Sequence, residues 1–390
     1  MRQAALMLAA HPPGRGTGSA VRGAVSLEAI RSLFARVDVI SLAAPGEERF
    51  ADPDARLIAR PGRQGSLRRV AMLPRGGTYF SDERAAATVD RVRALVAGGE
   101  LLERYDLVWC HSALMARAAH VVAAGAHVLD IDNVPSADVR SRAAAGVPRR
   151  VYRGALAAAL GREERRRADL HDLVTVTSPS ERDRLGRVRP PVRVLPNTVP
   201  AAAPAPVADS DRRVLFVGSL HYGPNVDAVR WMAEEIVPRL RTLVPGVDVR
   251  VVGREPGDHM RRLCEQAGIE LVADAPSLQP HHHAARVMLA PLRSGGGTKI
   301  KVLEALACGV PIVATPQAID GLQLTPGVDV HEAADADGLA RGLAALLQDA
   351  AAAARMGAAG RAVWAQRHDP AAARRIIERI VDDLIGPPHR

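Results

Sequence analysis

The stretch Arg293-Ser-Gly-Gly-Gly-Thr-Lys-Ile-Lys-Val-Leu-Glu-Ala-Leu-Ala-Cys-Gly-Val-Pro-Ile-Val-Ala-Thr315 predicts a glycine-rich loop, a short helix and a buried strand. Thr298 is a favourable N-cap residue, and apolar side chains follow it at the helical spacing. Gly309 and Pro311 are typical of a helix end. The three consecutive glycines leave the backbone N–H groups of residues 295–297 open to a ligand.

Only two of the 52 Lys and Arg residues are lysines, and both, Lys299 and Lys301, lie at the start of this helix. A helix N-terminus already carries about half a positive charge, so a cation there is normally unfavourable. The pattern is consistent with an anion that binds where the loop N–H groups, the helix dipole and the two ammonium groups meet. We therefore predict a phosphate site that consists of Gly295, Gly296, Gly297, Thr298 and Lys299.

Glu304 follows Thr298 by six residues, which is about 9 Å along a helix axis. That distance separates a diphosphate from a ribose, and a carboxylate can accept hydrogen bonds from two ribose hydroxyls. The alternative is that Glu304 only pairs with Lys301 at the i, i+3 spacing on a solvated helix face.

The run Ser294-Gly-Gly-Gly-Thr-Lys-Ile-Lys-Val-Leu-Glu304, continued to Thr315 and followed by Asp320-Gly-Leu322, closely resembles the donor-site segment of family 4 glycosyltransferases. These are the retaining "group 1" enzymes. Residues 214–231 resemble the opening of their donor domain, and residues 192–198 resemble the end of their acceptor domain. The resemblance implies the GT-B fold, an α/β architecture of two facing Rossmann-like domains with parallel sheets and a cleft between them.

Strand-like runs alternate with helical stretches along the whole chain, which is typical of doubly wound parallel sheets. The predicted strands lie at 4–9, 37–42, 107–110, 127–131, 173–177, 192–195, 214–217, 248–252, 269–272, 287–290 and 311–314. We expect an acceptor-side domain over 1–198, a Pro- and Ala-rich linker over 199–211, a nucleotide-sugar donor domain over 212–367 and a C-terminal amphipathic helix over 368–390. In the resembled family that helix crosses back to the first domain.

A second glycine-rich loop, which contains Gly14, Gly16 and Gly18, follows the first predicted strand and opens a helix. With Asp38 about twenty residues later, a dinucleotide site is one alternative, but the third glycine of that fingerprint is missing. The resembled family has a similar loop over the donor diphosphate, with Gly16 and Gly18 near the phosphates and Arg22 toward the acceptor.

His111 ends a predicted strand, at the edge where ligands of open parallel sheets bind. The resemblance implies that this histidine contacts the transferred sugar; otherwise it is a hydrogen-bonded loop residue. Asp130, Asp132 and Asn133 end the next strand, and we assign Asp132 and Asn133 to the acceptor side. A cation site and a turn cap are the alternatives for this trio.

Two departures from the family pattern concern the donor site. The first glutamate of the family's Glu pair, seven residues apart in many members, falls here on Gly296, so the transferred sugar is not readable. The loop from Gly218 to Asn225 lacks the Arg and Lys that other members turn toward the phosphates. We hypothesise that Lys299 and Lys301 supply that positive charge and serve the reaction directly, with Gly218 close to the phosphates.

Composition sets further limits. Cys110, Cys264 and Cys308 are scattered without disulfide or metal spacing, which favours a reducing, cytoplasmic compartment. Three consecutive histidines, residues 281–283, fan around a helix and cannot share one metal ion. Aromatic residues make up 3% of the chain and no nucleic-acid module is recognisable.

Charge is uneven along the chain: arginines outnumber acidic residues by ten in residues 1–200, whereas the second half is nearly neutral. This excess suits an anionic membrane surface or a lipid-linked acceptor, and a solvated arginine-rich helix is the alternative. The expected location is therefore cytoplasmic, with peripheral contact at the inner face of the plasma membrane.

The predicted function is transfer of a sugar from a nucleoside diphosphate sugar to a hydroxyl of a glycan or lipid-linked glycan. The resemblance implies retention of anomeric configuration without a metal or cofactor, as in bacterial cell-envelope polysaccharide biosynthesis. Two alternatives are a sugar-nucleotide epimerase of the same architecture and a non-catalytic binding protein.

Overall fold

The computed structural model describes residues 2–11, 13, 18–43, 55–59, 82–141, 147–204, 212–296 and 299–387. The chain forms two compact units. The first unit consists of Met1–Thr198, Gly296–Thr298 and Pro370–Arg390, and the second consists of Val199–Gly295 and Lys299–Asp369.

The first unit is built on a seven-stranded sheet with the order β3-β2-β1-β4-β5-β6-β7, in which every pair is parallel. The strands are β1 (Arg2–Ala9), β2 (Phe34–Ala43), β3 (Ala55–Ala59), β4 (Arg104–His111), β5 (Ala123–Ile131), β6 (Leu173–Val176) and β7 (Val192–Val194). Its helical segments are α1 (Gly18–Leu33), α3 (Asp82–Ala97), η3 (Ala118–Val121), α4 (Pro135–Ser141), α5 (Val147–Ala168), α6 (Pro179–Leu185) and α15 (Pro370–Ile385).

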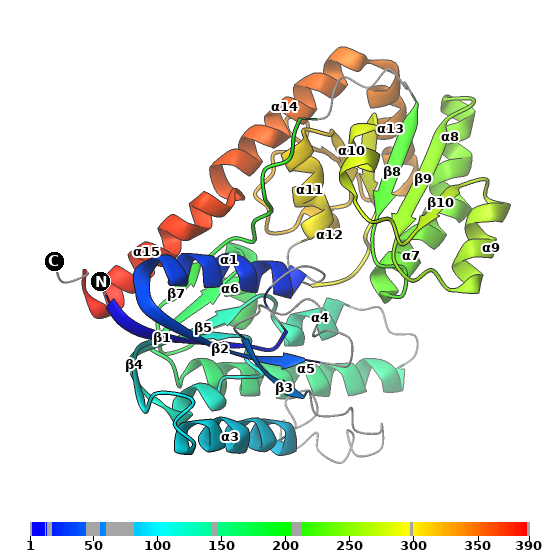
Figure 1. Ribbon diagram of the computed structural model, residues 1–390. Helices are drawn as coiled ribbons and strands as arrows, with labels where there is room; N and C mark the ends of the chain where they lie inside the picture. The colour runs from blue at the N-terminus through cyan, green and yellow to red at the C-terminus, as the bar shows by residue number, and fades with distance from the viewer. Residues whose placement is uncertain are drawn as a thin grey trace. The chain divides into compact units, whose positions relative to one another are not determined.

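Both faces of this sheet are covered, which explains why β1 is continuously apolar from Ala4 to Ala9 rather than alternating. Leu6 and Leu8 point to a cluster on one face, which includes residues of α3 and η3. Met7 points to the cluster on the other face, which α1 and α15 complete. Figure 1 shows α1, near the start of the chain, beside α15, near its end. The C-terminal helix is therefore part of the core of the first unit.

The second unit repeats the same winding with a six-stranded parallel sheet of order β10-β9-β8-β11-β12-β13. The strands are β8 (Arg213–Val217), β9 (Asp248–Gly253), β10 (Glu270–Ala273), β11 (Val287–Ala290), β12 (Ile312–Ala314) and β13 (His331–Glu332). Its helical segments are α7 (Gly223–Trp231), η4 (Met232–Ile236), α8 (Val237–Leu243), α9 (Asp258–Gln266), α10 (Gln279–His283), α11 (Ile300–Cys308), α12 (Pro316–Ile319), α13 (Ala336–Gln348) and α14 (Ala350–Arg367). The α/β fold with two parallel sheets is as predicted.

All eleven predicted strands are present, and two further strands were missed. β3 has Arg56 at its second position and the exposed Leu57 at its centre, so it lacks the apolar run that marks a buried strand. β13 is two residues long, too short for any periodicity. Both lie at the outer end of a sheet, where strands are partnered on one side only.

Helix α11 ends as predicted but begins one residue later than expected. Gly309 takes the left-handed conformation, with φ 72°, that closes a helix end. The N-cap is Lys299, whose side chain makes no capping hydrogen bond, and Thr298 lies outside the described residues. Across the described residues, no helix combines the length and the apolar character that crossing a bilayer requires.

Replacement of Ile377 by Ala should lower the free energy of unfolding of the first unit by about 2–5 kcal/mol, because this fully buried α15 side chain belongs to the core cluster that contains Trp109. Urea titration followed by Trp109 fluorescence, with Trp231 and Trp364 replaced by Phe, measures this unit selectively. The control is Arg375→Ala, at an exposed position of the same helix, with an expected change of about 0.5 kcal/mol or less. Equal losses in the two variants would contradict a core role for α15.

Candidate functional site

Strand pairing places three polar side chains in a row at the carboxyl edge of the first sheet. His111 is the last residue of β4 and pairs in register with Asp130 of β5, which in turn pairs with Thr175 of β6. Ligands of doubly wound sheets bind outside this edge, where the strand order changes direction between β1 and β4.

Asp130 is the centre of a buried hydrogen-bond network. Its carboxylate is fully buried and accepts from Thr175 Oγ1 at 2.6 Å and from His111 Nδ1 at 2.7 Å. Arg22 of α1 adds a bidentate contact, with Nη2 at 2.5 Å and Nε at 3.1 Å. Burial alone would raise the pKa of Asp130, but the charge of Arg22 and the hydrogen bond from His111 outweigh it and lower that pKa well below its usual range.

His111 is buried, and both of its ring nitrogens face oxygen atoms. Nδ1 meets Asp130, and Nε2 lies 2.9 Å from the backbone oxygen and 3.2 Å from Oγ of Ser19, in the first turn of α1. Burial opposes protonation of the ring, but the hydrogen bond and the charge of Asp130 outweigh it and raise the pKa of His111. The contact of His111 with a sugar stays a prediction.

Arg22 ties the start of α1 to the end of β7. Its Nη1 donates to the backbone oxygen of Leu195 at 2.7 Å and to Oδ1 of Asn197 at 2.8 Å. The buried Arg22 side chain binds these groups and Asp130, so it links α1, β5 and the segment after β7 at the carboxyl edge of the sheet. Its predicted place on the acceptor side stays a prediction.

The other first-domain residues predicted from the sequence are only partly covered by the structure. Asp132 and Asn133 follow β5 and are half-buried, and their acceptor-side role remains a prediction. Gly18 is the first residue of α1, while Gly16 lies outside the described residues.

Asp38 does not occupy a cofactor position. It lies five residues before the end of β2 and accepts hydrogen bonds from Tyr105 Oη at 2.7 Å and from Arg36 Nε at 2.9 Å. Because ligands of such sheets bind beyond the strand ends, this internal position argues against the dinucleotide alternative.

In the second unit the two glycine-containing loops follow β8 and β11, which are neighbours at the corresponding switch point. Gly218 comes directly after β8. A Cβ atom at this position would lie 2.7 Å from Lys301 Nζ and 2.8 Å from Asn225 Nδ2, closer than real Cβ contacts. A side chain at this position would therefore displace the ends of Lys301 and Asn225 from the strand end.

Lys301 brings positive charge to this strand end from the first turn of α11. Its Nζ donates to Asn225 Oδ1 at 2.6 Å and lies 4.3 Å from the centre of the Phe216 ring. Asn225 is fixed in turn, because its Nδ2 donates to the backbone oxygen of Ser219 at 2.9 Å. Asn225 was not singled out from the sequence.

Lys299 folds back onto the glycine-rich loop. The buried side chain donates from Nζ to the backbone oxygen of Gly295 at 3.1 Å, and Gln317 Nε2 donates to the same oxygen at 2.7 Å. Gly295 has φ 110°, a conformation that favours glycine. Gln317 was also missed, since nothing in its local sequence distinguishes it from an ordinary helix residue.

Glu304 and Lys301 lie on one side of α11 and influence each other electrostatically. Burial raises the pKa of Glu304 to about 7, against the opposing charges of Lys301 and Arg254. Burial also lowers the pKa of Lys301 to about 7, assisted by the nearby charge of Lys299 and opposed by Glu304. Lys301 directs its hydrogen bond to Asn225 rather than to Glu304, so the simple i, i+3 ion pair is not what the structure contains.

Gly296 is the last glycine of the glycine-rich loop that the structure describes. The N–H of Gly296, a residue that groups with the first unit, donates to Asp138 Oδ1 of α4 at 3.0 Å. Gly297 and Thr298 lie outside the described residues.

The three consecutive histidines, residues 281–283, lie on α10. His282 is buried, and His283 Nε2 lies 3.0 Å from the backbone oxygen of Ala203. Within the described ranges no group of three or more metal-ligating side chains has the geometry to hold an ion.

Comparison with known proteins finds a family model that matches part of the second unit. Residues 211–349 match the family model of group 1 glycosyl transferases. Over 144 residues the chain is 35% identical to a GDP-mannose-dependent alpha-(1-6)-phosphatidylinositol monomannoside mannosyltransferase of Mycolicibacterium smegmatis. That alignment covers 32% of this chain and spans 37% of the relative's length.

Solved structures resemble the whole chain. Sucrose-phosphate synthase from Thermosynechococcus elongatus has a TM-score of 0.73 at 17% identity, with 98% of this chain and 99% of the other covered. HepE from Anabaena, in complex with UDP and glucose, has a TM-score of 0.67 at 13% identity, with 97% and 99% covered. The pneumococcal O-GlcNAc transferase GtfA, in complex with UDP and GlcNAc, has a TM-score of 0.65 at 10% identity, with 99% and 100% covered. The GT-B fold is thereby confirmed, as is the group 1 resemblance over residues 211–349.

Proposed function

We propose that the protein transfers a sugar from a nucleoside diphosphate sugar to a hydroxyl acceptor. The observation that carries this proposal is the position of Lys301, whose ammonium group reaches the end of β8 beside Gly218, at the switch point of the second unit. The family match over residues 211–349 supports the same activity.

In the proposed reaction the bond between the anomeric carbon and the diphosphate oxygen breaks, and its electron pair stays on the diphosphate. A new bond forms between the anomeric carbon and the acceptor oxygen, whose hydroxyl proton passes to an oxygen of the leaving diphosphate. Negative charge therefore grows on the leaving diphosphate, and fixed positive groups lower the energy of that transition state most. Lys299, Lys301, the N–H groups of the glycine-rich loop and the N-terminus of α11 are the groups we assign to this task.

We assign further contacts by the family resemblance. Glu304 accepts from the ribose hydroxyls, His111 contacts the transferred sugar, and configuration is retained. In this scheme the charge on the diphosphate is balanced by the protein's own cations.

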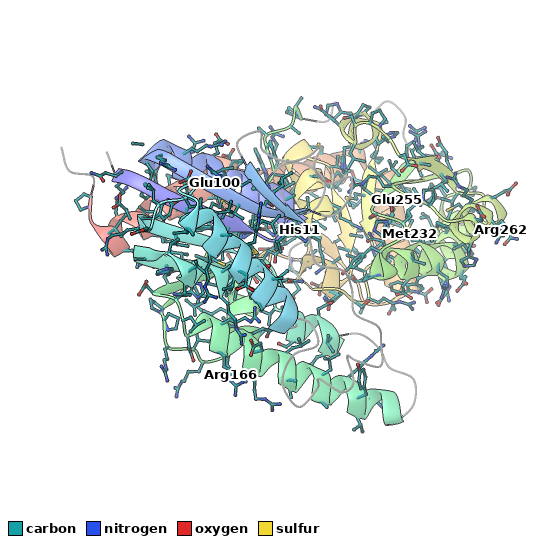
Figure 2. The ribbon with its side chains drawn as sticks, turned by 60° about the horizontal axis from the view of Figure 1, so that its bottom comes forward. His11, Glu100, Arg166, Met232, Glu255 and Arg262 are labelled. Atoms are coloured by element: carbon teal, nitrogen blue, oxygen red, sulfur yellow. The ribbon has the colours of Figure 1, made fainter. Side chains whose placement is uncertain are left out.

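The acceptor we propose is lipid-linked, with peripheral contact between the first unit and an anionic membrane. Helix α5 supports this, because Arg162 and Arg166 are exposed on it, and so are Val151 and Tyr152 nearer its start. Figure 2 shows Arg166 among the side chains that extend outward from this helix. Arginine beside exposed apolar side chains is the combination that binds anionic interfaces. The name of the mycolicibacterial relative also includes a lipid acceptor.

Incubation with a panel of GDP- and UDP-sugars, with and without lipid extract, tests the activity. We expect release of nucleoside diphosphate that depends on the lipid extract, and a labelled glycolipid product. Conversion of the nucleotide sugar without any acceptor would instead indicate the epimerase alternative. A protein that binds nucleotide without turning it over would indicate the non-catalytic alternative.

Replacement of Lys299 by Ala should lower turnover about 100- to 1000-fold, the typical effect of removing one donor that stabilises a developing anion. The fold should persist, because Gln317 still donates to the Gly295 oxygen. The matched control is Arg293→Ala, which removes an exposed cation of the same loop that pairs with Asp227. Initial rates of nucleoside diphosphate release measure both variants. Equal turnover in the Lys299 variant and the wild type would exclude the phosphate role.

Affinity for GDP-mannose or UDP-glucose should be highest near pH 7, because the pKa of Lys301 and the pKa of Glu304 are both about 7. As pH rises above 7, Lys301 of the nucleotide-free protein loses its proton. Binding of the diphosphate then requires uptake of a proton, so the affinity falls. As pH falls below 7, Glu304 gains a proton and can no longer accept from both ribose hydroxyls.

Titration calorimetry across pH 5.5–8.5, at about half-unit steps, measures this profile for the wild type and two variants. Lys301→Arg should flatten the alkaline side, because arginine stays charged, and Glu304→Gln should flatten the acid side. If both variants keep the wild-type profile, these two residues do not meet the nucleotide.

A further inference from the structure

The orientation of the His111 ring is set by two acceptors on opposite sides. Asp130 Oδ2 lies 2.7 Å from Nδ1, and the backbone oxygen of Ser19 lies 2.9 Å from Nε2. A carboxylate and a carbonyl oxygen only accept hydrogen bonds, so both ring nitrogens donate when both bonds are made. The Ser19 hydroxyl, which can accept or donate, lies farther from Nε2 at 3.2 Å, so the shorter contact with the backbone oxygen is the one that requires a donor at Nε2. An imidazole donates from both nitrogens only in its doubly protonated, cationic form.

We infer that Asp130 is a positioning residue, which holds His111 as a cation with a fixed ring orientation at the carboxyl edge of the first sheet. The inference rests on the proposed function, in which His111 contacts the transferred group. It assigns His111 the part of a fixed positive charge whose two ring N–H groups are already donated to Asp130 and Ser19, and it excludes His111 as the base that takes the acceptor's proton.

The charged groups around the ring are few and come from several elements. Arg22 on α1 and Asp130 on β5 are in direct contact, and Asp132, just after β5, acts at longer range to favour protonation of His111. Cys110 on β4 is a neutral thiol, since burial raises its pKa. Two cations, Arg22 and His111, thus share one buried carboxylate, and Asp132 supplies a further negative charge at longer range.

Arg22 and Asp130 have opposite effects on His111, which separates the proposal from a purely structural role. The charge of Asp130 favours the protonated ring, whereas the charge of Arg22 disfavours it. Loss of the Asp130 charge should therefore shift the titration of His111 to lower pH, and loss of the Arg22 charge should shift it to higher pH. A network that only held the fold together would release the ring toward the ordinary value of about 6.5 in both cases.

NMR spectra of the imidazole groups test the inference on the full chain. The His111 signals, identified among the 13 histidines by their loss in His111→Gln, should show two ring N–H groups at pH 7.5 in the wild type. In Asp130→Asn the ring should be neutral at that pH. In Arg22→Gln it should stay protonated to higher pH than in the wild type.

Asp38→Asn is the matched control, because Asp38 is a buried carboxylate of the same sheet that accepts from Tyr105 rather than from a histidine. It should leave the His111 titration unchanged. A singly protonated His111 ring in the wild type at pH 7.5 would overturn the inference, whether or not the variants fold. So would an unaltered titration in a folded Asp130→Asn.

The kinetic counterpart is a fall in kcat of about 100-fold in Asp130→Asn, with the KM for the nucleotide sugar changed only a few-fold. The alkaline limb of the wild-type pH profile should move to lower pH in this variant. Since the NMR measurement needs no turnover, an inactive wild-type protein with a doubly protonated His111 would contradict the proposed function and leave the positioning role standing.

Discussion

A parallel β-sheet delivers the segments that follow its strands to one edge, and this constraint determines where chemistry can occur in both units. The strand order reverses between β1 and β4 in the first sheet and between β8 and β11 in the second. His111 ends β4, and Gly218 directly follows β8. Each unit thus has its polar groups at the one place where two crossovers diverge and leave room for a ligand.

Charge is arranged against the local helix dipole in both units. Lys299 and Lys301 lie at the start of α11, and His111 meets the first turn of α1. Positive charge at a helix N-terminus is unfavourable by itself, so each arrangement is held in place by other contacts. In the first unit the buried carboxylate of Asp130 compensates, and in the second unit Asn225 and the Phe216 ring receive Lys301. In the proposed function, the incoming diphosphate balances the charge of these lysines.

The sequence was sufficient to predict the fold because the strands of a sheet covered on both faces are continuous apolar runs. Residues such as Leu6, Met7 and Leu8 carry that signal without any help from tertiary structure. The strands that escaped prediction are β3, whose apolar run is interrupted by Arg56, and β13, which has only two residues.

The candidate site was only partly predictable. Glycines and lysines at the start of α11 form a local pattern, so they could be identified from the sequence alone. Asn225 and Gln317 lie 76 residues before Lys301 and 22 residues after Gly295, respectively, and their roles arise only when strands β8, β11 and β12 align. The central role of Asp130 likewise depends on Arg22, which is 108 residues away. The local sequence does not predict such pairings, because they depend on the register of the strands and on the crossover connections between them.

Lys301 and Glu304 of α11 are both partly buried, and neither side chain fully stabilises the charge of the other. Removal from water disfavours the charged forms of both Lys301 and Glu304, and their mutual attraction does not restore either to its ordinary pKa. Partial burial of two ionisable groups costs stability that well-packed apolar residues at the same positions would not. In the proposed function a ligand completes their interactions, a diphosphate for the ammonium group and ribose hydroxyls for the carboxylate. The same energetic reasoning assigns no ligand to Asp38 or Asp130, whose interactions are complete within the first unit.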